Sequence, residues 1–155
     1  MPALAQNPPM IGLLQRVSSA SVEAGGRELA AIGEGLLVLV GVQKDDAETQ
    51  AGRLLERLLH YRVFPDGQGR MNRSLHETGG GLLLVPQFTL AADTKSGTRA
   101  GFSTAAEPAR ARQLFDHLVG AARSAWPQTA AGAFGADMKV RLVNEGPVTF
   151  WLECR

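Results

Sequence analysis

The chain has 155 residues, of which 45% are hydrophobic and 20% are charged, and its formal net charge is +1 at pH 7. This length and composition predict one globular domain with a substantial core, and they exclude a chain that stays disordered for lack of apolar side chains. A net charge so near zero provides no overall basic field, so contact with nucleic acid would depend on a local patch.

The cysteine content and the length of the apolar runs indicate the compartment in which the protein would be found. Cys154 is the only cysteine, which excludes an intramolecular disulfide and argues against a cysteine cluster for metal binding. No apolar run reaches the ~20 residues that span a bilayer, and the N-terminus lacks the basic and apolar regions of a signal peptide. The sequence therefore predicts a soluble, cytoplasmic protein without membrane contact.

Residues 1–9 differ from the rest of the chain. They show no apolar periodicity, and the Pro8-Pro9 pair cannot join the hydrogen-bond ladder of a sheet. We predict a disordered or non-native extension over residues 1–9 and a folded domain over residues 10–155.

The first folded segments are predicted to be strands. Residues 11–17 contain Arg16, which either extends from a sheet edge into solvent or acts as a fixed cation that holds backbone carbonyls. Gly25-Gly26 supplies the positive φ angles of a hairpin turn. The apolar run over residues 35–42 indicates a central strand that is buried on both faces.

Two amphipathic helices are predicted, one in each half of the chain. The first opens at Asp45-Asp46, where an aspartate would cap the first turn, and it runs to about Tyr61. The second has Pro108 in its first turn and ends before Pro127.

Two loops carry basic side chains. The first follows a short strand at residues 62–64 and a turn at residues 65–69, and the second spans residues 91–102. Both suit contact with phosphate, although a solvated surface and a merely flexible loop are equally consistent with these residues. The four cations are Arg70, Arg73, Lys95 and Arg99.

The stretch from Leu82 to Leu90 is predicted to be a buried strand that brings Gln87 and Thr89 to a rim. Near the C-terminus, two alternating segments flank the turn at Gly146-Pro147 and predict a terminal hairpin. The whole pattern indicates an α+β fold, with a mixed β-sheet or barrel-like core, two helices packed outside and a C-terminal β-hairpin.

Common catalytic patterns are absent from the sequence. The three histidines, His60, His76 and His117, are far apart and have no metal-ligand spacing. There is no nucleophile elbow, phosphate-binding loop or dinucleotide fingerprint. An enzyme with this sequence would work without a strong protein acid or base. The hydrogen-bonding and backbone-shaping candidates that remain are Gln87, Thr89, Asn144, Gly146, Pro147 and Thr149, which are equally ordinary strand and turn residues.

Two motifs give these residues a specific context. The segment Pro86-Gln87-Phe88-Thr89-Leu90 is similar to the Ser-Gln-Phe-Thr-Leu motif of the D-aminoacyl-tRNA deacylase family. The segment Asn144-Glu145-Gly146-Pro147-Val148-Thr149 matches that family's Asn-x-Gly-Pro-x-Thr motif, and the likeness spans Met10 to Glu153. Pro86 stands where the family usually has serine, which removes a hydroxyl group and a backbone donor. A related branch that acts on L-aminoacyl-tRNA carries proline there.

The resemblance implies a homodimer that hydrolyses the ester of D-aminoacyl-tRNA, and of glycyl-tRNA mischarged on the wrong tRNA. It implies a cis Gly146-Pro147 bond that enters the partner's pocket and rejects L-amino acids, with Arg16 fixing its orientation. It also places Asn144, Thr149, Phe134 and Met138 in substrate binding. It implies no metal, no cofactor and no DNA partner.

Catalysis would then rest on Gln87, Phe88 and Thr89. Backbone amides near Phe88 and Thr89 would stabilise an oxyanion, and the ribose 2′-hydroxyl of the substrate would assist. A Thr89 nucleophile is an alternative mechanism, but no base is visibly placed to activate it. Two rival functions also remain. One is a non-catalytic tRNA-binding module that uses the two basic loops, and the other is a structural dimer in which both motifs are only turns.

Overall fold

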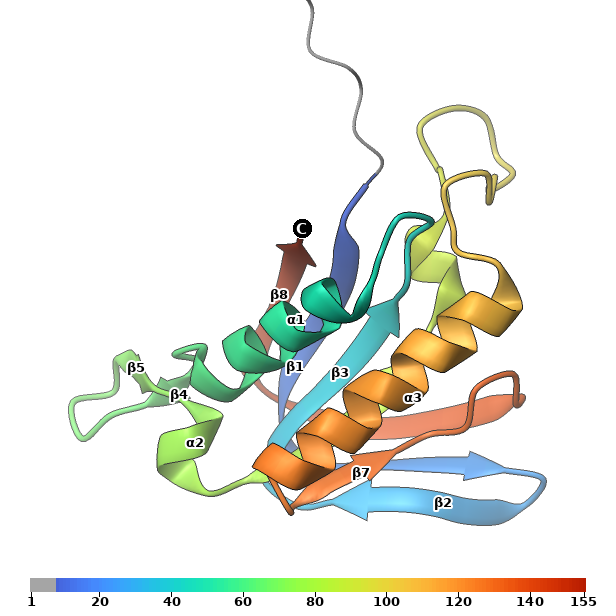
Figure 1. Ribbon diagram of the computed structural model, residues 1–155. Coiled ribbons are helices and arrows are strands. Elements are labelled where there is room, and N and C mark those ends of the chain that lie inside the picture. Colours follow the sequence, from blue (N-terminus) through green and yellow to red (C-terminus); the bar gives the residue numbers. More distant parts are fainter. Residues whose placement is uncertain (1–7) are drawn as a thin grey trace, which may run out of the picture.

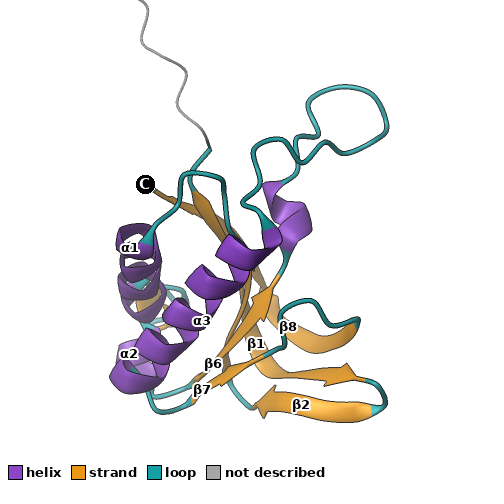
Figure 2. Cartoon of the chain, turned by 45° about the vertical axis from the view of Figure 1, so that its right-hand side comes forward, coloured by secondary structure: helices purple, strands orange, loops and turns teal. Residues whose placement is uncertain are grey.

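A mixed sheet forms the centre of the protein, whose computed structural model describes residues 8–155 (Figure 1). Apart from Pro8 and Pro9, the predicted extension over residues 1–9 lies outside the described residues. The sheet strands are β1 Met10–Ala24, β2 Arg27–Ile32, β3 Gly35–Gly41, β6 Gly81–Pro86, β7 Thr129–Ala131 and β8 Met138–Cys154. Their order is β2-β1-β3-β6-β7, and β8 pairs with β1. The sheet curls into a nearly closed barrel (Figure 2).

The first three strands form where the sequence predicts them. Gly25 and Gly26 have φ angles of 58° and 76°, and they turn the chain between antiparallel β1 and β2. Strand β3 lies in the middle, antiparallel to β1 and parallel to β6. Its side chains alternate between two buried clusters, with Leu36 and Val38 on one face and Leu37 on the other. Burial on both faces explains why this run is apolar throughout.

Helices α1 (Glu48–His60) and α3 (Pro108–Ala125) cover one face of the sheet (Figure 1). Their apolar stripes supply the larger buried cluster, including Leu54 and Leu58 from α1 and Leu114 and Leu118 from α3. Trp126 ends α3, and its indole Nε1 donates to the Gly80 oxygen at 2.8 Å. This bond attaches the end of the helix to the start of β6. In the part of the chain that the structure describes, no helix is long and apolar enough to cross a membrane.

Helix α1 starts later than predicted. Ala47 is its N-cap, and the Gln50 side chain accepts from the Ala47 amide at 2.8 Å. Asp46 does not cap the helix, because its carboxylate turns back and accepts from the Gln43 amide at 2.6 Å. The sequence shows a good capping residue there, but a local hydrogen bond from the backbone of Gln43, three residues earlier, takes the carboxylate instead.

The segment between the helices is also more ordered than predicted. The expected strand at residues 62–64 is β4, Phe64–Pro65, and it pairs with β5, Met71–Arg73, inside the predicted basic loop. Asp66 closes the turn between them by accepting from the amides of Gln68 and Arg70 at 2.8 and 3.0 Å.

Helix α2 (Leu75–Thr78) and strand β7 were not predicted either. Helix α2 begins at a capping box in which Glu77 N donates to Ser74 Oγ at 3.3 Å and Ser74 N donates to Glu77 Oε1 at 3.1 Å. The Ser-x-x-Glu spacing is a signal in the sequence that would have found it. Strand β7 consists of Thr-Ala-Ala, and its two alanines carry little strand preference.

Burial of Asp46 has an electrostatic consequence. Only 6% of the residue is exposed. Desolvation raises the pKa of its carboxyl from 3.8 to about 6, against the opposing effect of backbone hydrogen bonds from Gln43 and Met10. The folded protein therefore holds this proton more tightly than the unfolded chain does.

We expect Asp46 to lower stability as the pH rises from 3.8 to about 6, because the unfolded chain loses the proton first. The contribution to the free energy of unfolding is roughly 1–3 kcal/mol. Hydrogen bonds lower the pKa values of Glu48, Asp66 and Glu77, which act in the opposite direction. Urea denaturation of wild type and Asp46→Asn across this range isolates the effect, and a pH-independent difference would contradict it.

Candidate functional site

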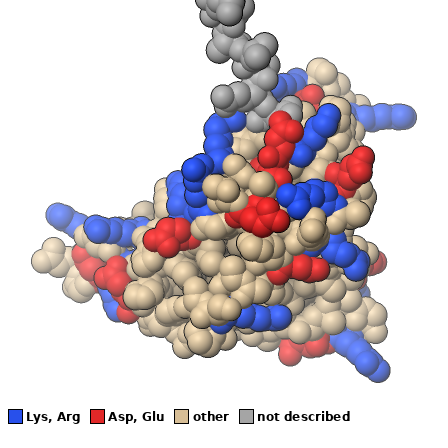
Figure 3. Space-filling model, viewed as in Figure 1, with Lys and Arg blue, Asp and Glu red and all other residues tan. Residues whose placement is uncertain are grey.

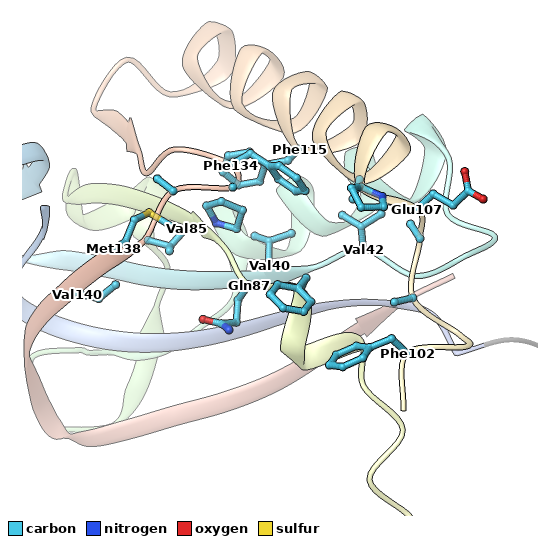
Figure 4. A pocket seen from close by; sticks show the side chains of 18 residues that line it. Val40, Val42, Val85, Gln87, Phe102, Glu107, Phe115, Phe134, Met138 and Val140 are labelled. Atoms are coloured by element: carbon cyan, nitrogen blue, oxygen red, sulfur yellow. The ribbon is translucent and has the colours of Figure 1, made fainter. Parts of the chain in front are cut away.

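A largely apolar cavity of about 740 Å³ lies where β3 and β6 end beneath α3 (Figure 4). Val40 forms part of its floor, Phe115 of α3 forms part of one wall, and Phe134 and Met138 line it from the segment that leads into β8. Gln87 is a polar side chain in this lining. The size and apolar walls suit one small organic ligand with few polar contacts.

Glycine at position 41 allows the motif segment to approach the sheet. A Cβ atom there would lie 2.9 Å from the Leu90 Cβ and 3.5 Å from both the Ala91 nitrogen and the Gln87 oxygen. The Gln87 amide in turn donates to the Val40 oxygen at 2.8 Å. These contacts fix the segment after β6 against the end of β3, at the edge of the cavity.

The motif segment itself is not a strand beyond Pro86. Strand β6 ends there, and Phe88–Ala91 forms the 3₁₀ helix η1. Gln87 and Phe88 line the cavity, whereas the exposed Thr89 is not in its lining. The Gln87 Nε2 donates to the Thr89 Oγ1. The predicted strand is therefore wrong past Pro86. A proline there lacks the N–H that continues a ladder.

The second motif forms a turn within β8. Its peptide bond Gly146-Pro147 is cis. The Asn144 side chain joins the two ends of the turn. Its Oδ1 accepts from the Val148 amide at 2.8 Å, and its Nδ2 donates to the Thr149 Oγ1 at 2.9 Å. Gly146 and Pro147 are exposed to solvent, whereas the Val148 side chain is partly buried and packs against the larger core cluster.

Arg16 holds the turn from β1. Its Nε donates to the Glu145 oxygen at 3.0 Å, and its Nη1 donates to the Val63 oxygen at 2.7 Å. One guanidinium thus connects the turn to the segment between α1 and β4. Of the two interpretations of Arg16, the geometry supports the fixed cation that binds carbonyls.

The two motifs lie apart within one chain. Arg16 pairs with Leu36 near the start of β3, whereas the cavity lies beside Val40 and Val42 at its other end. Four residues of strand separate Leu36 from Val40, which is about 13 Å at the rise of a β-strand. Of the predicted site residues, Gln87, Phe88, Phe134 and Met138 line the cavity, and Arg16, Asn144, Gly146, Pro147, Thr149 and Thr89 do not.

The two basic loops are separate surfaces. Lys95 and Arg99 lie on a loop closed by paired hydrogen bonds between Asp93 and Gly101, and this loop leads directly into the cavity wall. Arg70 and Arg73 lie on the β4–β5 arm, on the other side of the molecule (Figure 1). Basic and acidic side chains are interspersed over the face in Figure 3, so this face carries no single large basic patch.

Some neighbours were missed by sequence reasoning. His60 and His76 were expected to be separate, but their ring centroids are 5.2 Å apart where α1 meets α2. Phe102 and Phe115 line the cavity without belonging to either motif, and the sequence distinguishes neither from an ordinary core residue. Among residues 8–155, no group of three or more histidine, cysteine, aspartate or glutamate side chains could hold a metal ion.

Comparison with solved structures supports the architecture. The structure of a c-Myc DNA unwinding element binding protein matches with a TM-score of 0.89 and 32% identity, over 94% of this chain and 99% of that chain. A probable eukaryotic D-amino acid tRNA deacylase matches with a TM-score of 0.82 and 18% identity, over 93% and 98%. The second likeness concerns the fold alone.

Comparison of sequences is more specific. The family model described as D-Tyr-tRNA(Tyr) deacylase matches residues 13–153. A D-aminoacyl-tRNA deacylase of Thioalkalivibrio sulfidiphilus is 64% identical over 144 residues, which are 93% of this chain and 97% of the relative. One of Alkalilimnicola ehrlichii is 62% identical over 146 residues, or 94% and 97%. The chain therefore belongs to the D-Tyr-tRNA(Tyr) deacylase family.

Proposed function

We propose that this protein hydrolyses the ester bond of D-aminoacyl-tRNA and releases free tRNA and the D-amino acid. The observation that carries this proposal is the placement of Gln87 and Phe88, from the first family motif, at the edge of an apolar cavity. Relatives that carry the name of this activity match over nearly their whole length. Glycyl-tRNA mischarged on the wrong tRNA is the second substrate.

Selection between D- and L-amino acids would come from a second copy of the chain. The Gly146-Pro147 turn is exposed and held on both sides, and it lies at the far end of β3 from its own cavity. In a homodimer it would enter the partner's cavity. Backbone carbonyls of the turn would accept from the substrate's ammonium group and occupy the space of an L side chain. Glycine has no side chain to exclude, so its ester would also react.

The chemical step would depend on positioning and backbone donors. A water molecule would attack the ester carbonyl, the bond from that carbon to the ribose 3′-oxygen would break, and the 3′-oxygen would take a proton. Amides of Phe88 and Thr89 lie at the start of η1, where the first N–H groups of a helix have no partner inside it. They are the candidate oxyanion donors, and the substrate's 2′-hydroxyl would assist the proton transfer.

Thr89 would position the motif and would not act as the nucleophile. Its hydroxyl oxygen accepts from the Gln87 Nε2, and the side chain lies outside the cavity lining. We expect Thr89→Ala and the similarly shaped Thr89→Val to retain kcat within about tenfold of wild type, because losing one neutral hydrogen bond costs about 1 kcal/mol. A loss of about a thousandfold in both variants, in single-turnover assays on the D-ester, would favour the nucleophile instead.

Hydrolysis of matched D-tyrosyl-, L-tyrosyl- and glycyl-tRNA by the purified protein, with a chelator present, tests the function. We expect release from the D-tyrosyl and glycyl esters and survival of the L-tyrosyl ester. Hydrolysis of the L-ester would point to a specificity altered by Pro86. Binding of charged tRNA without turnover of any ester would favour the non-catalytic tRNA-binding module.

Mixing two inactive variants tests the shared site. Phe134→Trp would fill the cavity, and a variant with residues 145–148 replaced by glycine would remove the turn. Mixed dimers contain one intact cavity facing one intact turn, so an equal mixture should recover about a quarter of wild-type activity. No recovery, with dimers formed, would contradict a turn supplied by the second copy.

A further inference from the structure

Two exposed phenylalanines form a pair at the mouth of the cavity. Phe88 is 61% exposed and Phe102 is 44% exposed, and their ring centroids lie 5.4 Å apart at an interplanar angle of 42°. The first comes from η1 and the second from the loop that precedes α3, and both line the cavity. Large aromatic side chains are normally placed where they can be covered, so an exposed pair beside a cavity marks a contact surface.

Backbone contacts hold both rings in place. The Gln87 amide fixes the start of η1 to the Val40 oxygen at 2.8 Å. On the other side, the Thr104 Oγ1 donates to the Ala91 oxygen at 3.3 Å, and the Lys44 amide donates to the Thr104 oxygen at 2.8 Å. The backbone that carries Phe88 is therefore bonded to β3, and the backbone near Phe102 is bonded to η1 and to the segment that follows β3.

The size of the cavity indicates which part of the substrate would contact the two phenylalanine rings. A volume of about 740 Å³ suits a single ligand of modest size, here the terminal adenosine with its amino acid. Phe88 and Phe102 are large exposed apolar side chains of the cavity lining, so the nucleotide before that adenosine would leave the cavity past them. The same loop carries Lys95 and Arg99, both exposed, which can contact backbone phosphates. Glu107 lies on the α3 side, and its carboxylate points away from the cavity (Figure 4).

We infer that Phe88 and Phe102 form a stacking surface for the base of the nucleotide that precedes the terminal adenosine of the aminoacyl-tRNA. The inference rests on the proposed function, because it assumes that the terminal adenosine occupies the cavity. Stacking on an aromatic ring tolerates every base, since each base has a π-face. This surface would thus add affinity for the single-stranded end of any tRNA without reading its sequence.

Substrates of two lengths test the stacking surface. One is the D-tyrosyl ester of adenosine, and the other is the D-tyrosyl ester of a trinucleotide that ends in the same adenosine. We expect Phe102→Ala to raise KM for the trinucleotide ester about tenfold more than KM for the adenosine ester, and Phe102→Trp to restore the difference. Met71→Ala is the matched control, because Met71 is 46% exposed on the distant β5.

Removing the base from the substrate completes the test. A trinucleotide ester with an abasic penultimate position should bind wild type about as weakly as the intact ester binds Phe102→Ala. The two changes together should cost little more than either alone. The inference of stacking would be overturned if the losses in affinity from the Phe102→Ala variant and from the abasic substrate were additive. It would also be overturned if KM changed equally for the adenosine and trinucleotide esters. Failure of wild type to hydrolyse the adenosine ester would instead count against the proposed function.

Discussion

Replacing Arg16 with lysine should lower kcat/KM for D-tyrosyl-tRNA by about 10- to 100-fold and reduce discrimination against the L-ester. The planar guanidinium reaches two carbonyls in different segments, that of Glu145 at 3.0 Å and that of Val63 at 2.7 Å. A lysine ammonium is a point charge on a flexible stem and cannot reproduce this pair of directions. A loosened turn would hold its own carbonyls less accurately in the second copy's cavity, and small displacements are costly in catalysis.

The control for Arg16→Lys is Arg57→Lys. Arg57 also donates to a β8 carbonyl, that of Glu153 at 3.0 Å, but it does so at the far end of the strand. We expect the control to keep both activity and selectivity. The test is steady-state kinetics of both variants on the D- and L-tyrosyl esters, with circular dichroism to verify the fold. An Arg16→Lys enzyme with wild-type selectivity would remove Arg16 from the account of chiral selection.

Of the glycine-to-alanine substitutions in the sheet, Gly35→Ala should lower the free energy of unfolding most. A Cβ atom at Gly35 would lie 1.9 Å from the Gly81 oxygen and 2.7 Å from the Gly81 nitrogen, both of them backbone atoms. Gly35 and Gly81 are register partners at the start of parallel β3 and β6, so relief would require the two strands to separate. We expect a loss of about 3–5 kcal/mol in the free energy of unfolding, or no folded protein at all.

Gly33→Ala is the matched control two residues earlier. A Cβ atom there would meet nothing within 4 Å, and we expect a change within about 0.5 kcal/mol. Urea denaturation midpoints of both variants, with folded yield as a second readout, provide the comparison. A Gly35→Ala protein within about 1 kcal/mol of wild type would show that β3 and β6 can separate without penalty.

Local patterns predicted the parts of the fold that local chemistry controls. Gly25-Gly26 gave the hairpin because its positive φ angles are a property of glycine itself. The apolar run of β3 gave the central strand, because burial on both faces leaves no polar position. The proline at position 108 correctly marked the first turn of α3.

The errors occurred where the residues allow competing local structures, or where the packing of a distant segment decides between them. Asp46 has the properties of a helix cap, yet its carboxylate accepts from Gln43 and is buried. Thr89 was predicted on a strand at the rim, but the chain turns into η1 after Pro86. Phe102 reaches the cavity only through the folding of the loop before α3, and nothing in its sequence neighbourhood indicates that position.

The pairing of β8 with β1 has a consequence for engineering. Gln15 pairs with Thr149 and Val17 pairs with Asn144, so residues 145–148 leave the ladder while both arms of β8 stay in register with one strand. Lengthening a loop whose ends are already fixed costs little chain entropy. Positions 145–147 could therefore be randomised or extended in a combinatorial library, with Val148 kept because it packs against the core, and variants with altered substrate preference could be selected from this scaffold.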